Sequence, residues 1–450
     1  MINLFEYQNT VGITDSIDGL EDFLDDIWNS RERSTFYTEK EGENSQSQRF
    51  LQFIRKTNEI KSNKYVGVIH YNGNKINLLP KIFFDARKEY STTEINQIQN
   101  HILWWLSYCR KIKFPNYQAS LSTVRSDFFE VLIYLFSKYT LELLSSSLYQ
   151  QYEEVSDELV FIKGRLNTSE YINENLSKGK WHKLNCTYDA FVFDNEFNRI
   201  IKYVTNLLFR ITSSLESKKS LREILFILDD VSDVKASAEQ CSKITFNPMF
   251  GEFETVRDYC QLFLSNSVSF DYKNDLKLFA FLLPMEYLFE DFVFGFIDRE
   301  LPSISVLSQR SDTYLDEGRA FRLKPDLWIK AKDKSLIADT KYKIVYEDQE
   351  DPKKGISQND LYQMLAYAVR FEVDEIVLFY PNTLKNQLLD DSEFIIKDAL
   401  ANGKEISVKV FQLPVVNSEL LDKTLESGID LREIFKSTRE KLIKRLKVSI

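Results

Sequence analysis

The sequence predicts a multidomain chain of the α+β and α/β classes that ends in a mixed central sheet flanked by helices. Its 450 residues suffice for two or three hydrophobic cores, and contents of 43% hydrophobic and 14% aromatic residues indicate a folded protein. Strand-like segments on either side of a helical segment at 359–367 indicate a parallel crossover. The predicted parts are a β-rich N-terminal module at 1–94, a mostly helical region at 95–274 with a β segment near 159–190, and a sheet-containing domain at 275–450.

The N-terminal module is predicted from two strand-like segments, 64–70 and 75–83, which the turn residues Asn72, Gly73 and Asn74 join. The role of this module stays open between a docking surface, a scaffold and a DNA reader. Docking or scaffolding is favoured, because aromatic and basic residues do not alternate there as they do in a surface that binds nucleic acid.

The middle region is predicted to be mainly helical, because apolar residues recur there at helical spacing. Helices are expected at 95–112, 122–151, 195–209, 221–228 and 255–264. A strand is expected at 159–166, where Gly164 marks either a bend or a functional position. No G-x-x-x-x-G-K-[ST] loop occurs in the sequence, which excludes nucleotide binding by that route.

A candidate site lies in two extended segments, 323–329 and 335–345, which a short charged turn joins. Asp326 begins the first segment, and Asp339 and Lys341 lie near the middle of the second. Residues two apart on a strand project from the same face, so Asp339 and Lys341 are expected to lie together. Burying these charges is unfavourable unless each is paired or binds a metal.

Two carboxylates brought together across a hairpin can hold a hard cation such as Mg²⁺, and a nearby lysine can act on the attacking water or the transition-state charge. The pattern predicts metal-assisted phosphodiester hydrolysis. Asp326, Asp339 and the backbone carbonyl of Thr340 are the expected metal ligands, and Lys341 is the expected catalytic lysine. Pro-Asp, a gap and Asp-x-Lys form the signature of the PD-(D/E)xK nucleases, which predicts an endonuclease domain at 275–450. An exposed charged stripe is the alternative, because Asp-x-Lys triplets are common by chance.

Helices on either side of the hairpin add candidate residues. The preceding helix offers Glu290, or else Glu286, as a further catalytic acid and metal ligand, and a solvated surface acid is the alternative for either. The following helix places Gln363 and Tyr367 one turn apart on a single face. Such a Gln-x-x-x-Tyr pair resembles the RecB-like branch of the superfamily, in which the glutamine supports the metal-bound cluster and the DNA contacts.

The segments 337–343 (IADTKYK) and 357–363 (SQNDLYQ) resemble the McrC family. Its members are the nuclease subunits of McrBC restriction systems, which act on DNA that contains 5-methylcytosine. Further matches to this family lie at 161–166 (FIKGRL), 188–191 (YDAF) and 195–202 (NEFNRIIK), so the resemblance covers most of the chain.

The resemblance implies a division of labour between subunits. It implies that a GTP-hydrolysing AAA+ hexamer of the McrB type recognises methylated double-stranded DNA, while this chain docks on it, stimulates hydrolysis and cuts with Mg²⁺. It also places partner contacts in the middle region, where the candidates are Lys163, Arg165, Asn198 and Arg199. The family helix before the hairpin need not carry an acid where Glu290 stands, so the resemblance does not assign that ligand.

Two other functions stay open. A stand-alone nuclease of the same superfamily, in DNA repair or mobile-element transfer, would cleave DNA without partner or nucleotide. A motor activator with a decayed site is the second alternative, although the full set of Asp326, Asp339, Lys341 and Gln363 argues against decay.

Charge and hydropathy predict a cytoplasmic protein without a membrane segment. The sequence has no run of about eighteen apolar residues, and it does not begin with basic residues followed by a long apolar stretch. The four cysteines and three histidines are too dispersed for a metal site. A net charge of −10 excludes DNA binding by bulk electrostatics, so DNA contact must be local or supplied by a partner. A basic helix at 430–446 offers either a phosphate contact or a solvated face.

Overall fold

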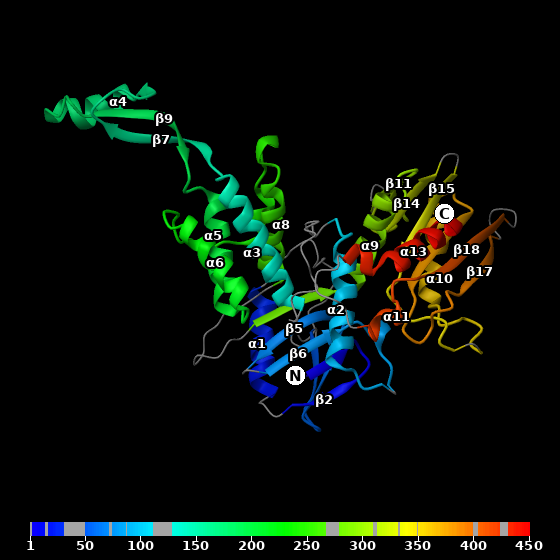
Figure 1. Ribbon diagram of the computed structural model, residues 1–450. Helices are drawn as coiled ribbons and strands as arrows, with labels where there is room; N and C mark the ends of the chain where they lie inside the picture. Colours follow the sequence, from blue (N-terminus) through cyan, green and yellow to red (C-terminus); the bar gives the residue numbers. More distant parts are fainter. Residues whose placement is uncertain are drawn as a thin grey trace. The chain divides into compact units, whose positions relative to one another are not determined.

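The computed structural model describes residues 2–13, 17–30, 50–71, 74–86, 88–110, 128–266, 279–308, 313–331, 334–348, 350–398, 404–423 and 431–450. The chain divides into two compact units (Figure 1). Unit 1 consists of Met1–Leu132 and Ser265–Ile450, and unit 2 of Ile133–Leu264. The predicted turn at Asn72 and Gly73 lies outside the described residues.

The N-terminal part of unit 1 is rich in strands, as predicted. Its elements are β1 (Ile2–Phe5), β2 (Thr10–Gly12), α1 (Ile17–Ser30), β3 (Leu51–Ile54), β4 (Glu59–Ser62), β5 (Tyr65–Tyr71), β6 (Asn74–Leu79), the 3-10 helix η2 (Lys81–Phe83) and α2 (Thr92–Leu106). Strands β5 and β6 pair antiparallel, and β1 joins β6 in parallel. Strand β10 (Phe279–Pro284) pairs antiparallel with β5, so a distant segment completes this sheet. A separate small sheet has the order β2-β4-β3.

One glycine allows β10 to approach β5. Gly67 has a φ of +141°, and a Cβ atom at this position would lie 1.9 Å from the carbonyl oxygen of Phe281 in β10. Any side chain would therefore push the two strands apart.

Helix α2 connects the N-terminal part of unit 1 to its C-terminal part. The helix begins with a capping box, in which Ser91 and Glu94 exchange hydrogen bonds. The ring of Trp104 stacks on Phe435 at a centroid distance of 4.7 Å and meets Phe292 edge-on. These buried rings join both parts of the chain in one core, because aromatic side chains remove large apolar areas from water.

The boundaries of the two compact units therefore differ from those of the three predicted parts, 1–94, 95–274 and 275–450. The strand β10 lies within 275–450 but belongs to the N-terminal sheet, and α2 crosses the predicted boundary at residues 94 and 95 and packs in unit 1. Composition along the chain does not show such pairings, because they join segments far apart in sequence.

Unit 2 combines helices with one small sheet. Its elements are α3 (Phe128–Ser146), β7 (Gln151–Leu159), β8 (Arg165–Leu166), α4 (Thr168–Glu170), η3 (Tyr171–Asn175), η4 (Leu176–Lys178), β9 (Leu184–Val192), α5 (Glu196–Ile211), α6 (Leu215–Ile227), α7 (Ala238–Lys243), η5 (Pro248–Phe250) and α8 (Phe253–Asn266). Helix α5 buries the predicted apolar face, with Phe197, Ile201 and Val204 at 2% exposure or less. Helix α3 ends earlier than predicted, because the chain enters β7 at Gln151.

The strand predicted at 159–166 is wrong. Strand β7 ends at Leu159, and most of the predicted segment is a connection that leads into the short β8. The apolar run Val160, Phe161 and Ile162 contributed to the strand prediction, but these side chains are 75%, 60% and 64% exposed. These three side chains therefore lie on the protein surface rather than inside a sheet.

The sheet of unit 2, in the order β7-β9-β8, belongs to a projecting structure. In Figure 1, β7, β9 and α4 extend away from the helices α3, α5, α6 and α8 of the same unit. We call residues 151–192 the arm. The connection with the exposed run 160–162 lies within this arm.

The C-terminal part of unit 1 contains a mixed sheet. Its elements are α9 (Met285–Glu300), β11 (Ile304–Ser308), β12 (Thr313–Tyr314), β13 (Arg322–Leu323), β14 (Leu327–Ala331), β15 (Lys334–Thr340), α10 (Gln358–Phe371), β16 (Glu375–Pro381), β17 (Asp391–Asp398), β18 (Lys404–Leu413), α11 (Ser418–Leu421), α12 (Leu431–Ile434) and α13 (Lys436–Ser449). In the described part of the chain, six strands take the order β11-β14-β15-β16-β18-β17. The predicted parallel pairing of the strands that flank α10 is confirmed, and β16 also pairs in parallel with β18.

The second strand of the predicted hairpin is shorter than expected. Strand β15 ends at Thr340 rather than near residue 345, and the amide of Lys341 makes one further bond, 2.8 Å long, to the carbonyl oxygen of Phe379. Lys341 therefore lies where the chain leaves the sheet. This position places the lysine at the carboxyl end of a parallel strand, where the sheet edge is open to functional groups.

The basic C-terminal segment forms two helices, α12 and α13, rather than one helix at 430–446. Arg439 pairs with Glu300, and Arg445 donates to the carbonyl oxygens of Gln412 and Leu389. Two of the basic residues in this C-terminal segment thus make contacts within the fold. Every helix among the described residues is too short or too polar to cross a lipid bilayer.

We expect the buried side chain of His101 to make the free energy of unfolding of unit 1 depend on pH. Its Nδ1–H donates to the carbonyl of Gln97 at 2.8 Å, and its Nε2 accepts the amide of Asn417 at 3.2 Å. Burial lowers the pKa of His101 from 6.5 to about 4. A group whose pKa is lower in the folded than in the unfolded state stabilises the fold at pH values above its unfolded pKa. This stabilisation is lost as the pH falls toward the folded pKa. We expect this contribution to decrease by about 2 kcal/mol between pH 7.5 and pH 5.

Urea unfolding of wild type and of His101→Gln at both pH values measures this contribution. Buried carboxyls with a raised pKa, such as Glu6 with a pKa of about 7, change stability in the opposite direction over the same range. The informative quantity is therefore the difference in unfolding free energy between the two proteins. We expect this difference to shrink at pH 5, and a constant difference would contradict the assignment.

Candidate active site

The pairing of β14 with β15 brings the two predicted carboxylates together. Leu327 pairs with Ala338, so the register continued by one residue places Asp326 opposite Asp339. Side chains of directly opposed residues project from the same face of a sheet. The backbone N–H and the hydroxyl of Thr340 both donate to Asp326 Oδ2 at 2.8 Å, which orients this carboxylate.

Burial and neighbouring charges raise the pKa of both carboxyls of the pair. Burial raises the pKa of Asp339 to about 7, and the charge of Asp326 adds to this effect while Lys341 opposes it. Burial also raises the pKa of Asp326 to about 6, with a further increase from the charge of Glu290. Among the described residues, Asp339 Oδ1 has no hydrogen-bond partner although the residue is 1% exposed. A buried carboxylate oxygen without a protein donor is uncommon and fits the candidate metal ligand predicted at Asp339.

A chain of hydrogen bonds holds Lys341 against this pair. The Lys341 ammonium forms an ion pair with Asp339 and donates to Gln363 Oε1 at 3.0 Å. The Gln363 amide donates to the hydroxyl of Tyr367 at 2.7 Å, and this hydroxyl donates to the carbonyl of Lys324 at 3.0 Å. The one-turn spacing on α10 thus connects both residues to the carboxylate site.

The two acids of α9 lie near different groups. Glu290 is half-buried, and its charge raises the pKa of Asp326, which places it in the neighbourhood of the site. Glu286 is exposed, and its charge acts on Glu6 instead. Within the described residues, no group of three or more His, Cys, Asp or Glu side chains is arranged to hold a metal ion. The structure thus brings Glu290 near the carboxylate pair but does not form a three-acid cluster.

Sequence reasoning missed a second polar cluster next to the site. The Lys343 ammonium donates to both oxygens of Asp360, at 2.8 and 2.9 Å, and the Tyr380 hydroxyl donates to Asp360 Oδ2 at 2.9 Å. Asp360, in the first turn of α10, is 4% exposed. This cluster ties α10 and β16 to the segment that follows Lys341. Its sequence signal was the second lysine of Asp-x-Lys-x-Lys.

Two of the predicted partner contacts lie exposed on the arm. Lys163 Nζ lies 3.7 Å from the ring centroid of Tyr188, and Arg165 lies 3.7 Å from Glu154, in an exposed ion pair. Gly164 has a φ of +70°, and a Cβ atom there would lie 2.4 Å from a carbonyl oxygen of β9. Glycine is therefore required for the bend that presents the two cations.

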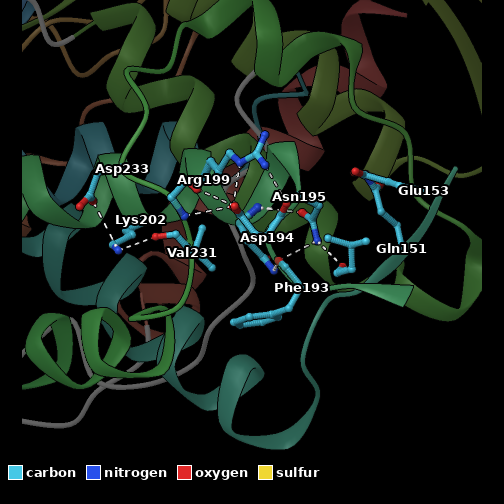
Figure 2. A network of polar contacts seen from close by, with 12 residues as sticks. Gln151, Glu153, Phe193, Asp194, Asn195, Arg199, Lys202, Val231 and Asp233 are labelled. Carbon is cyan, nitrogen blue, oxygen red and sulfur yellow. Dashed lines mark hydrogen bonds and ion pairs between the residues drawn. The ribbon is translucent and has the colours of Figure 1, made fainter. Parts of the chain in front are cut away.

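The other two predicted partner contacts belong to a structural network at the start of α5. Asn198 is fully buried, and its amide donates to the carbonyl oxygens of Tyr149 at 2.9 Å and Phe193 at 2.7 Å. Figure 2 shows the guanidinium of Arg199 directed at Asp194, to which its Nε donates at 2.7 Å. This hydrogen bond holds the pKa of Asp194 well below its usual range. Both residues therefore make contacts within unit 2, and their role as partner contacts stays a prediction.

Asn198→Ala is expected to destabilise unit 2 by about 1 to 3 kcal/mol, because a buried amide and its two hydrogen bonds are lost, while Asn195 still donates to both carbonyl oxygens. Urea unfolding measures the change. Arg165→Ala is the matched control, because its exposed ion pair contributes less than about 1 kcal/mol. An Asn198→Ala protein as stable as wild type that no longer binds a partner would instead assign the residue to the interface.

Comparison with known proteins places these features in a family. The family model for the McrBC 5-methylcytosine restriction system component matches residues 60–381. The Type IV methyl-directed restriction enzyme EcoKMcrBC of Escherichia coli (strain K12) is 24% identical over 293 residues, which cover 62% of this chain and 82% of that protein.

One solved structure has the same fold over nearly the whole chain. It is a chain of the refined half-complex from the tetradecameric assembly of Thermococcus gammatolerans McrB AAA+ hexamers with bound McrC. The TM-score is 0.66 at 18% identity, and the match covers 98% of this chain and 99% of the other. The family match spans most of the sequence, including Asp326, Asp339, Lys341 and Gln363. The chain belongs to the McrBC 5-methylcytosine restriction system component family.

Proposed function

We propose that this chain is the DNA endonuclease subunit of a modification-dependent restriction complex and that it hydrolyses phosphodiester bonds with Mg²⁺. The observation that carries the proposal is the hydrogen-bonded set of Asp326, Asp339, Lys341 and Gln363 at the end of β15. The mixed sheet, with α9 before the hairpin and α10 between the parallel strands, supports a nuclease core of the PD-(D/E)xK type.

The donor set of the site fits Mg²⁺. Asp326 and Asp339 offer carboxylate oxygens and Thr340 its backbone carbonyl, and hard cations prefer such oxygen ligands. The unpartnered Oδ1 of Asp339 and the raised pKa of both carboxyls fit a cation that would neutralise them. Bound there, Mg²⁺ supplies a Lewis acid for the phosphate and a more acidic water. Glu290 remains the candidate for a further ligand.

Lys341 is assigned to the attacking water or to the phosphate oxygens that gain charge in the transition state. Burial lowers its pKa, but the neighbouring carboxylates Asp339 and Asp326 raise it more, so the group stays an ammonium. Gln363 orients this ammonium, and Tyr367 orients Gln363. A fixed donor is needed because a small displacement of a catalytic group lowers the rate strongly.

The partner we propose is an AAA+ GTPase hexamer of the McrB type, which selects methylated double-stranded DNA. The fold shared with a chain from an assembly of McrB hexamers with bound McrC supports a docked subunit. The arm exposes Val160, Phe161 and Ile162 beside the cations Lys163 and Arg165. Clustered exposed apolar residues mark protein contacts, so we assign the arm to the motor. The net charge of −10 fits a nuclease that a partner delivers to DNA.

Plasmid cleavage tests the proposed function. Methylated and unmethylated plasmids are incubated with the chain in the presence and absence of Mg²⁺, GTP and the candidate motor. We expect cleavage only of methylated DNA and only with all three. Cleavage by the chain alone would indicate a stand-alone nuclease. Absence of cleavage with intact stimulation of GTP hydrolysis would indicate a motor activator with an inactive site.

A further inference from the structure

A buried polar cluster joins the N-terminal sheet to the residue that follows the catalytic lysine. Tyr342 and Glu6 are 3% and 1% exposed, and the Tyr342 hydroxyl donates to Glu6 Oε2 at 2.9 Å. The backbone N–H of Lys81 donates to the same oxygen at 3.1 Å. The Lys81 ammonium lies 4.6 Å from the centroid of the Tyr342 ring. The phenol is thus held from two sides by residues of the N-terminal part of unit 1.

The parallel pairing of β1 and β6 explains how Glu6 and Lys81 meet. Phe5 pairs with Leu79, so both strands leave the sheet at the same edge. The amide of Glu6 donates to the carbonyl of Leu79 at 3.0 Å, which continues this pairing by one residue. Glu6 and Lys81 therefore project together from the edge of the N-terminal sheet.

Tyr342 lies beyond the end of β15, so side-chain contacts rather than strand pairing fix the position of its segment. Strand β15 ends at Thr340, and one residue later the Lys341 amide still donates to the carbonyl of Phe379 in β16. Beyond this point, Tyr342 is held by Glu6, and Lys343 is held by Asp360. These two attachments fix the segment that directly follows Lys341.

Fold stability alone does not account for a carboxyl group at this position. Glu6 is buried, and burial raises its pKa to about 7 against the opposing effects of Lys81 and Tyr342. Apolar residues of similar volume often stabilise an interior better than buried charged groups. What a hydrogen-bonded pair adds is a single defined position for the groups that it joins.

We propose that Glu6, acting through Tyr342, is a positioning residue for Lys341, so that the N-terminal sheet forms part of the nuclease site. This role rests on the proposed nuclease function. The N-terminal module predicted as a docking surface or scaffold thereby contributes to catalysis itself.

Steady-state cleavage by the full chain in its active complex tests the proposal. In Tyr342→Phe, which keeps the ring, and in Glu6→Ala, we expect kcat to fall by roughly 10-fold to 100-fold. For Tyr342→Phe, KM for DNA and the melting temperature should stay near wild type, and so should the affinity for Ca²⁺, measured by calorimetry in place of Mg²⁺. Glu6→Gln keeps an acceptor oxygen for the phenol and should restore most of kcat.

Tyr346→Phe is the matched control, because it removes a hydroxyl from the same segment that donates instead to Ser392 at 3.1 Å. It should cleave like wild type. Wild-type kcat in Tyr342→Phe and Glu6→Ala, or a loss that only follows a lower melting temperature, would overturn the positioning role alone. A wild-type complex without Asp339-dependent cleavage would overturn the proposed function and this role with it.

Discussion

Asp339→Asn is expected to abolish DNA cleavage and to make the metal-free protein more stable at pH 8. The loss of cleavage should be on the order of 10³-fold or more, because one carboxylate of the proposed metal site and the ion pair that holds Lys341 are lost together. Cleavage falls while stability rises, because the buried Asp339 carboxylate that is proposed to bind the metal also disfavours folding when it is ionised.

The gain in stability has a defined pH dependence. Burial raises the pKa of Asp339 from 3.8 to about 7. A group with a raised pKa in the folded state contributes stability below its unfolded pKa, and this contribution is lost as the pH rises through the folded pKa. Asparagine does not ionise, so the variant keeps its stability. We expect a difference of a few kcal/mol that develops between about pH 4 and pH 8.

Urea unfolding with a chelator at pH 5 and pH 8 measures this difference. Asp348→Asn is the control, because Asp348 is an exposed acid in the loop after the same strand. The control should match wild type at both pH values. A less stable Asp339→Asn protein at pH 8 would show that the ion pair with Lys341 outweighs the burial of the charge. Added Mg²⁺ should stabilise wild type and not the variant.

Replacing Phe161 and Ile162 of the arm with aspartate is expected to lower the stimulation of GTP hydrolysis and the cleavage of methylated DNA by roughly 100-fold. Both side chains are more than half exposed, at 60% and 64%, so their removal should leave the fold unchanged. In an interface, a few buried apolar anchors carry most of the binding free energy, and two charges placed there would remain unpaired.

Binding of the chain to the motor hexamer and the rate of GTP hydrolysis are the two measurements for the arm. Leu215→Asp is the matched control, because Leu215 is an 83% exposed apolar residue on α6 of the same unit. It should behave like wild type. Full stimulation by the arm variant, with loss in the control, would move the proposed motor contact from the arm to α6.

Local patterns in the sequence predicted the parts of the candidate site that depend on short distances along the chain. A hairpin with a short turn brings Asp326 opposite Asp339, because residues equally far from the turn meet in antiparallel pairing. Helical spacing alone places Gln363 beside Tyr367. The parallel crossover through α10 was likewise predictable, because a strand, a helix and a strand in succession allow few other arrangements.

The strand predicted at 159–166 is wrong because a local sequence pattern does not show whether apolar side chains are buried. The apolar run at 160–162 has the composition of a buried strand, but no other element covers it in unit 2, and it stays exposed. A sequence window shows that residues are apolar and does not show what packs on them. Only the three-dimensional arrangement distinguishes an interior strand from an exposed contact surface.

The sequence by itself determined the groups of the candidate site: a carboxylate pair, a lysine two residues on, and a glutamine one turn before a tyrosine. Only the tertiary structure decided which residues hundreds of positions apart come into contact, including the residue that follows Lys341. Glu6 reaches Tyr342, and His101 reaches Asn417, because β10 and α2 join the two ends of the chain in one core. Such contacts follow from which apolar surfaces are buried together, and this is a property of the whole fold rather than of any segment.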